Sequence, residues 1–152
     1  MNTYYNLIEY LKNLFDSDTR VSNVVTGDFE QWQRDMFLLV HLDVTGSPFI
    51  EEQTTSLSRF VITINVLDIR DVNKEDIKDR FWFNDGRHDS WNDTFSVMKL
   101  ARDKAIKDYL RNDITLVTTT GAERVTYAYM SGLDGWQETW TIDVPDNFTA
   151  VC

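Results

Sequence analysis

LSRFVITINVLDI, residues 57–69, alternates apolar with mostly polar side chains along its whole length. Successive side chains of a β-strand point to opposite faces of the sheet, so a period of two predicts a strand with one face in the core. The side chains expected in the core are Phe60, Ile62, Ile64 and Val66.

The stretch before it, MFLLVHLDVTGSPF at residues 36–49, has the same period. Its expected core-facing side chains are Leu38, Val40, Leu42 and Val44. Together the two stretches predict a long β-hairpin. The connection from Gly46 to Ser56 is longer than the about 2–5 residues that a hairpin needs, so we expect it to project from the body of the protein.

Two amphipathic helices are predicted, one on each side of the hairpin. Asn2 or Thr3 caps the first helix, and Ser90 caps the second, with Asp93 completing a capping box and the helix ending near Leu110. The apolar stripe expected in the first helix is Tyr4, Leu7, Ile8, Leu11 and Phe15. The face expected in the second is Trp91, Phe95, Met98, Ala105 and Tyr109.

The remaining β-prone segments complete the fold prediction. They are residues 20–26, 114–120, 124–130 and 136–144, with turns at Gly121 and at residues 131–135. This order predicts one α+β domain over residues 1–152, in which an antiparallel or mixed β-sheet carries both helices on one face. Apolar residues on the other face predict a partner surface there: Leu39, Val61, Leu67 and Trp140. Leu100 lies opposite the apolar face of the second helix, among Lys104, Lys107 and Arg111, and is read equally well as a contact or as a stray surface leucine.

Composition disfavours several classes of protein. The net charge of −10 repels a phosphate backbone, and the single cysteine excludes an internal disulfide framework. Two isolated histidines make no zinc site, and no glycine-rich phosphate loop occurs, so we expect no metal and no cofactor. No stretch approaches the roughly 18 apolar residues of a membrane span, and the N-terminus lacks the features of a secretion signal. We therefore expect a soluble protein made in the cytoplasm.

Two stretches that invite a catalytic or metal-binding interpretation are better explained otherwise. DIRDVNKED, residues 68–76, lacks the glycine and the ligand spacing of a calcium loop, which favours a solvated charged connection. DGRHDS, residues 85–90, contains Asp, His and Ser in a row, but a catalytic triad is assembled by convergence in space. We expect no enzyme.

Aromatic residues are the remaining surplus, at 13% of the chain. A carbohydrate-binding cleft and a single-strand nucleic-acid platform both use such rings, although the second also needs basic residues. Core and interface packing is the favoured interpretation.

Three stretches together resemble small virion proteins of tailed bacteriophages, of the neck and tail-completion type that includes tail terminators. They are FVITINVLDIRD, DSWNDTFSVMKLARDKAIKDYL and LDGWQETWTIDVPDNFTAVC. The resemblance implies a structural subunit of the virion that forms a homo-oligomeric ring, commonly of six copies, as a head-tail connector. Its partners would be the tail tube protein and the head-completion or connector proteins.

A ring of this kind predicts two sets of residues. DNA passes through the channel without specific binding, so acidic side chains are expected in the lumen: Asp28, Glu30, Asp35, Asp71, Glu75 and Asp76. The interface is expected to include Gly46, Ser47, Pro48, Phe49, Glu51, Glu52, Leu100, Trp136 and Trp140. The alternative from another class is a small acidic binding or inhibitor protein of the immunity type, which would be a stable monomer.

Overall fold

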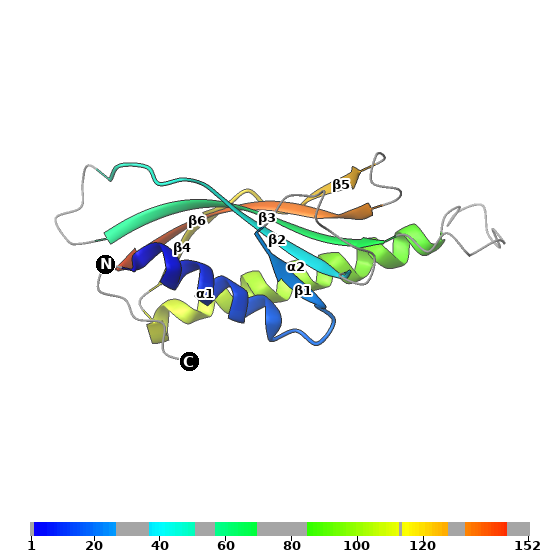
Figure 1. Ribbon diagram of the computed structural model, residues 1–152, viewed down its shortest axis with the longest axis horizontal. Coiled ribbons are helices and arrows are strands. Elements are labelled where there is room, and N and C mark those ends of the chain that lie inside the picture. Colours follow the sequence, from blue (N-terminus) through cyan, green and yellow to red (C-terminus); the bar gives the residue numbers. More distant parts are fainter. Residues whose placement is uncertain are drawn as a thin grey trace.

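The computed structural model describes residues 2–26, 37–50, 57–69, 85–112, 114–127 and 133–145. Helix α1 is Thr3–Asp16 and helix α2 is Asp85–Asn112. The strands are β1 (Asn23–Val25), β2 (Leu39–Gly46), β3 (Leu57–Ile69), β4 (Thr115–Thr119), β5 (Glu123–Tyr127) and β6 (Leu133–Pro145). The fold is α+β, as predicted, and both helices lie on the same side of the sheet (Figure 1).

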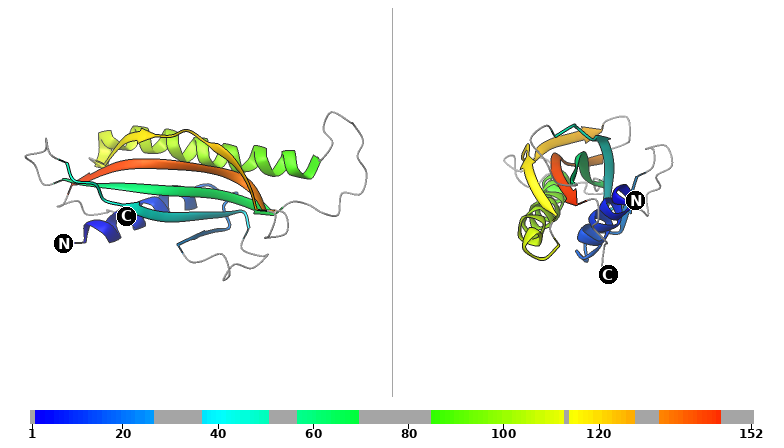
Figure 2. Two further views of the ribbon diagram at one scale, coloured as in Figure 1. Left: turned by 90° about the horizontal axis from the view of Figure 1, so that it is seen from above. Right: turned by 90° about the vertical axis from the view of Figure 1, so that its left-hand side faces the viewer.

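The six strands form one mixed sheet in the order β1-β2-β3-β6-β4. Only β1 and β2 are parallel, and β2 and β3 form the predicted antiparallel hairpin. β4 and β5 pair with successive parts of the same edge of β6, so they act as one edge strand interrupted near Gly121. Gly121 has a φ of 77°, a backbone conformation that favours glycine. The sheet curls around the helices when viewed along its length (Figure 2).

The hydrophobic core lies between the helices and the inner face of the sheet. All four predicted core residues of β3 are buried, and so are three of the four predicted on and beside β2. α1 contributes Leu7, Leu11 and Phe15, while α2 contributes Val97, Met98, Ala101 and Ala105. The alternating apolar residues of the strands therefore pack against the apolar faces of both helices in one hydrophobic cluster.

Both helix predictions need correction at the level of single residues. Tyr4 is 48% exposed and not part of the buried stripe, whereas Tyr10 and Leu14 are buried. Ser90 is not the cap of α2, because the helix begins at Asp85 and the backbone oxygen of Ser90 accepts a bond from Thr94 Oγ1 at 2.6 Å. The prediction of a cap at Ser90 was wrong because Ser, Thr and Asp also occur inside helices. There their side chains can form hydrogen bonds with nearby backbone groups.

The turn predicted at residues 131–135 is also corrected, since β6 already begins at Leu133. Gly135 pairs with Leu67 inside the sheet. A Cβ at this position would lie 1.9 Å from the backbone oxygen of Val66, so glycine is required for close approach of the strands and not for a turn.

Of the four apolar residues predicted to be exposed on the outer face of the sheet, three are buried and only Val61 is partly exposed. Leu39 and Leu67 are paired in register and both are 0% exposed. Trp140 faces the helices, where its ring stacks on Phe15 with the ring centres 6.0 Å apart. Trp140 alternates in phase with Ile142 and Val144, which belong to the core. The prediction that Trp140 lies on the outer face is therefore wrong.

Candidate functional site

The β2–β3 hairpin and the start of α1 lie at the same end of the molecule (Figures 1 and 2), and both carry exposed aromatic residues. Phe49 is 87% exposed, Tyr5 is 72% exposed and Tyr4 is 48% exposed. The ring of Tyr4 lies edge-on to Tyr5 and to the buried Phe60, with centres 5.8 and 6.4 Å apart. We call Tyr4, Tyr5 and Phe49 the aromatic end.

Strand β3 fixes the base of the segment that carries Phe49. The hydroxyl of Ser47 donates to the backbone oxygen of Arg59 at 2.7 Å. The guanidinium of Arg59 in turn makes two bonds to the carboxylate of Asp143 on β6, at 2.7 and 2.9 Å. A hollow of about 380 Å³ lies beside this segment, lined by Ser47, Pro48, Phe49, Ile50, Leu57, Ser58 and Arg59. Phe49 is thus an exposed ring on an anchored backbone, which suits a contact surface.

The predicted interface residues separate into groups. Gly46, Ser47, Pro48 and Phe49 are all exposed at this hairpin. Glu51 and Glu52 lie outside the described residues. Trp140 is excluded from an accessible surface, since it is 0% exposed.

Trp136 is half-buried and joins β6 to α2. Its Nε1 donates to the backbone oxygen of Trp91 at 2.8 Å, and its ring lies 5.3 Å from that of Phe95. The guanidinium of Arg124 on β5 sits 4.3 Å from the ring centre of Trp91. These contacts hold β5, β6 and the first half of α2 together, so the rings here serve packing.

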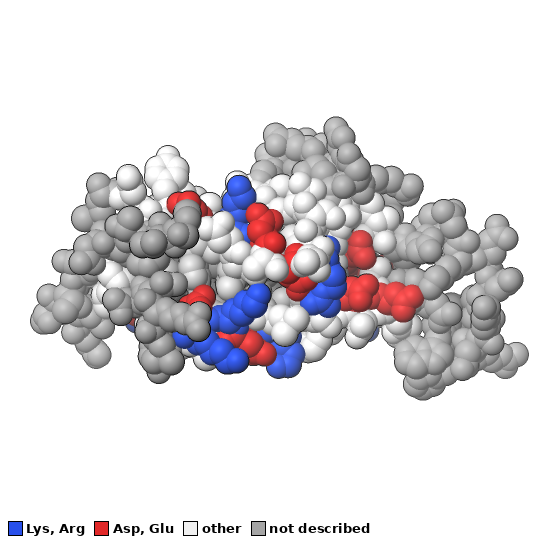
Figure 3. All heavy atoms as spheres, turned by 90° about the horizontal axis from the view of Figure 1, so that it is seen from below, with Lys and Arg blue, Asp and Glu red and all other residues white. Residues whose placement is uncertain are grey.

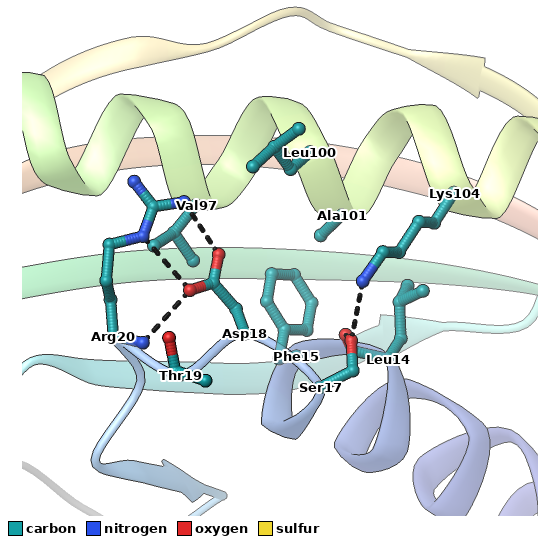
Figure 4. A pocket seen from close by; sticks show the side chains of 10 residues that line it. All are labelled: Leu14, Phe15, Ser17, Asp18, Thr19, Arg20, Val97, Leu100, Ala101 and Lys104. Carbon is teal, nitrogen blue, oxygen red and sulfur yellow. Dashed lines mark hydrogen bonds and ion pairs between the residues drawn. The ribbon is translucent and has the colours of Figure 1, made fainter.

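Leu100 is 50% exposed and borders a groove of about 310 Å³ between α2 and the end of α1 (Figure 4). On one wall, Arg20 makes two bonds to the carboxylate of Asp18, at 3.0 and 2.8 Å, and lowers the pKa of that carboxyl. On the other side, Lys104 Nζ lies 2.8 Å from the hydroxyl of Ser17. The predicted exposure of Leu100 is confirmed, and its contact role remains a prediction.

Charges of both signs share the helix-covered side of the molecule (Figure 3). Lys99, Lys104 and Lys107 of α2 are exposed, and Lys99 pairs with Asp103 at 3.2 Å. All six residues predicted for an acidic lumen, Asp28, Glu30, Asp35, Asp71, Glu75 and Asp76, lie outside the described residues. The acidic lumen therefore stays a prediction.

β6 carries a buried carboxylate that was not predicted from the sequence. Glu138 is 1% exposed and faces α2, where Arg102 Nη1 donates to both of its oxygens, at 2.9 and 3.1 Å. The indole of Trp140 donates to Oε1 at 3.0 Å, and the hydroxyl of Thr119 on β4 donates to the same oxygen. The signal was present, because Glu138 falls in phase with Trp140 and Ile142 on the core face. With these donors fixed around it, Glu138 is a structural group.

A second carboxylate cluster lies near the start of β6. Asp68 and Asp134 pair directly across β3 and β6, and Asp134 is 0% exposed. Burial raises the pKa of Asp68, and the charges of Asp93 and Asp134 raise it further, against a bond from the Ile69 backbone N–H. Within the described residues, no group of three His, Cys, Asp or Glu side chains is arranged to hold a metal ion.

His88 belongs to α2 and lies edge-on to the ring of Trp91, with the centres 5.5 Å apart. In the part of the chain that the structure describes, neither helix is long and apolar enough to cross a membrane. The chain matched no protein-family model and no curated protein.

Proposed function

We propose that this protein is a structural subunit of a tailed-bacteriophage virion, forming a ring in the neck or tail that joins the head connector to the tail tube. The resemblance of the sequence to neck and tail-completion proteins suggests the setting. DNA passes through the ring without being held, which agrees with the net charge of −10. Virion localisation and the six-fold copy number are parts of the same proposal.

The aromatic end is the observation that carries this proposal. Phe49 and Tyr5 expose most of their rings, which is costly in water and typical of anchors that a partner covers. Two strands and a partly buried ion pair, Arg59 with Asp143, support the segment that presents Phe49. The segment therefore supplies a contact surface to a neighbouring subunit or to the next ring.

The site contacts favour assembly over catalysis. Of the described carboxylates, Glu138 is fully engaged by donors and Asp143 is paired with Arg59. His88 packs edge-on against the ring of Trp91.

Electron microscopy of the purified protein, alone and with tail components, tests the ring directly. We expect particles with a central channel. Compact monomers at high concentration, with tight binding to a basic enzyme, would instead support the acidic inhibitor of the immunity type.

Replacing Phe49 with serine tests the aromatic end. We expect F49S to keep its thermal unfolding midpoint, because the ring is 87% exposed, and to lose ring formation or attachment to tails. The matched control is I106S, which removes an apolar side chain that is 49% exposed on α2, outside the aromatic end. Normal assembly of F49S would remove the aromatic end from the interface.

A further inference from the structure

Helix α2 carries a line of side chains whose two halves have opposite charge. Residues at steps of four and three along a helix share one face. Six residues of α2 follow this spacing and form what we call the α2 stripe: Asp89, Asp93, Ser96, Leu100, Lys104 and Lys107. Ser96 is half-buried and the other five are exposed. Lys and Arg gather over the second half of α2 (Figure 3).

The helix dipole does not explain this order of charges. It favours carboxylates in the first turn and ammonium groups in the last turn, and its effect falls off within that turn. α2 runs from Asp85 to Asn112, so Asp93 and Lys104 each lie eight residues, or more than two turns, from the nearer end. The charges inside the stripe therefore need another cause.

The stripe is complementary to itself when its direction is reversed. Asp93 and Lys107 both lie seven residues from Leu100, and Ser96 and Lys104 both lie four residues from it. A two-fold axis beside Leu100 would set α2 antiparallel to α2 of a second copy, so that each residue faces the one at equal distance from Leu100. Asp93 then faces Lys107 of the second copy, and Asp89 follows one turn farther along.

Two other carboxylates in the second half of α2 lie off the stripe and already have donors. Asp103 accepts from Lys99 Nζ at 3.2 Å, and Asp108 accepts from the hydroxyl of Tyr10 at 2.8 Å. The two ammonium groups of the stripe are therefore the charges that this half presents to a second α2.

Leu100 supplies an apolar centre to the stripe, and a hollow lies beside it. Its side chain is 50% exposed and borders the groove of about 310 Å³, whose apolar lining comes from Leu14, Phe15, Val97 and Ala101 (Figure 4). A two-fold axis beside Leu100 brings the leucine of each copy to the groove of the other. An exposed leucine and an open apolar groove, each unfavourable in water, would then cover one another.

Helix α1 leaves room for this contact. It flanks the second half of α2, where Tyr10 bonds to Asp108 and Ser17 to Lys104. In an antiparallel pair the two copies of α1 therefore lie at opposite ends of the contact, each beside the basic half of its own stripe.

We propose that α2 forms a two-fold antiparallel contact with α2 of a second copy, centred on Leu100. The inference does not depend on the proposed ring. A two-fold contact joins only two copies, so alone it gives a dimer, and where rings form it sets two rings back to back. Exposed ion pairs contribute little each and are screened by ions, so the dimer is weak and dissociates as the salt concentration rises.

Reversing the charges of one half tests the pairing. K104E/K107E has an entirely acidic stripe and D89K/D93K an entirely basic one, so each should repel its own copies and dimerise at least about tenfold more weakly than wild type in sedimentation equilibrium. Circular dichroism checks that both are folded. An equimolar mixture of the two should form a one-to-one dimer, because every acidic side chain then faces a basic one.

The matched control carries all four changes. D89K/D93K/K104E/K107E keeps the net charge and the self-complementary order, so it should dimerise as wild type does. A monomeric wild type at low salt, dimerisation of both two-residue variants at the wild-type strength, or a mixture that stays monomeric would each overturn the contact.

Cysteine cross-linking locates the axis. In L100C/C152S the two thiols lie beside the two-fold axis, so mild oxidation should link copies in pairs. The control is I106C/C152S, because Ile106 is 49% exposed on α2 but lies off the stripe. Equal cross-linking of the two variants would overturn the assignment of the axis. Rings seen in the microscope without an L100C cross-link would overturn the α2 contact and leave the ring proposal standing, whereas cross-linked dimers without rings would do the reverse.

Discussion

Two carboxylate sites on the inner face of β6 differ in what surrounds them. Glu138 is buried among donors, with Arg102, Trp140 and Thr119 all bonded to it. Asp68 on β3 and Asp134 on β6 stand opposite each other farther along the same face, and the pKa of Asp68 is raised by burial and, to a smaller extent, by the charges of Asp93 and Asp134. Donors thus surround the carboxylate at the first site, whereas burial and like charges both disfavour the ionised form of Asp68 at the second.

Removing the cation from the first site should have the largest effect. R102A leaves the Glu138 carboxylate buried without its charged partner, and we expect a loss of about 3 kcal/mol in the free energy of unfolding. The value is taken at the low end of the range because the Arg102 side chain is 21% exposed. Urea denaturation measures it.

The matched variant is R102M/E138L, which replaces both charges with apolar groups of similar size. It should recover part of the stability lost in R102A, since no buried charge remains, but not all of it, because the buried indole of Trp140 loses its acceptor. A double variant as unstable as R102A would show that the uncompensated charge of Glu138 does not dominate the loss.

Gly135 allows the close approach of β3 and β6 beside the second site, Asp68 and Asp134. G135A places a Cβ against the backbone oxygen of Val66, at 1.9 Å in the present geometry, so the β3 and β6 backbones must separate. We expect destabilisation of about 1–3 kcal/mol. An alanine at Gly46, where a Cβ meets nothing within 4 Å, is the control and should cost far less. Equal effects would mean that the close approach is not limiting.

Neutralising Asp68 should have the smallest effect, with the opposite sign. Its pKa in the folded state is raised above the ordinary value of 3.8, so the folded protein binds the proton more tightly than the unfolded chain. The contribution of Asp68 to the free energy of unfolding therefore falls as the pH rises from 3.8 through the raised pKa. D68N should therefore be more stable than wild type at neutral pH, and the gain should vanish below about pH 3.8. A constant difference across pH would contradict this assignment, and D103N, at an exposed pair, is the control.

The alternation of apolar residues was enough to predict the β2–β3 hairpin, the fold class and the position of both helices on one face. It failed where one face of a strand carries polar core residues: Glu138 interrupts the apolar pattern of β6, and Trp140 was then assigned to the wrong side. The start of α2 was missed because Asp85–Asp89 has no apolar period to mark it. Of the three residues of the aromatic end, only Phe49 was predicted from the sequence. The exposure of Tyr4 and Tyr5 depends on where along α1 the contact with the sheet ends, which periodicity does not show.

The place of β6 in the sheet has a consequence for synthesis of the protein. This strand lies between β3 on one side and β4 and β5 on the other, yet the ribosome makes it after all of them. In a nascent chain that lacks β6, strands β1–β3 and strands β4–β5 cannot join into one sheet. The apolar residues of these strands then stay exposed to solvent. Folding of the sheet must therefore wait until residues 133–145 have left the ribosome, and chaperone demand during translation should be set by this final segment.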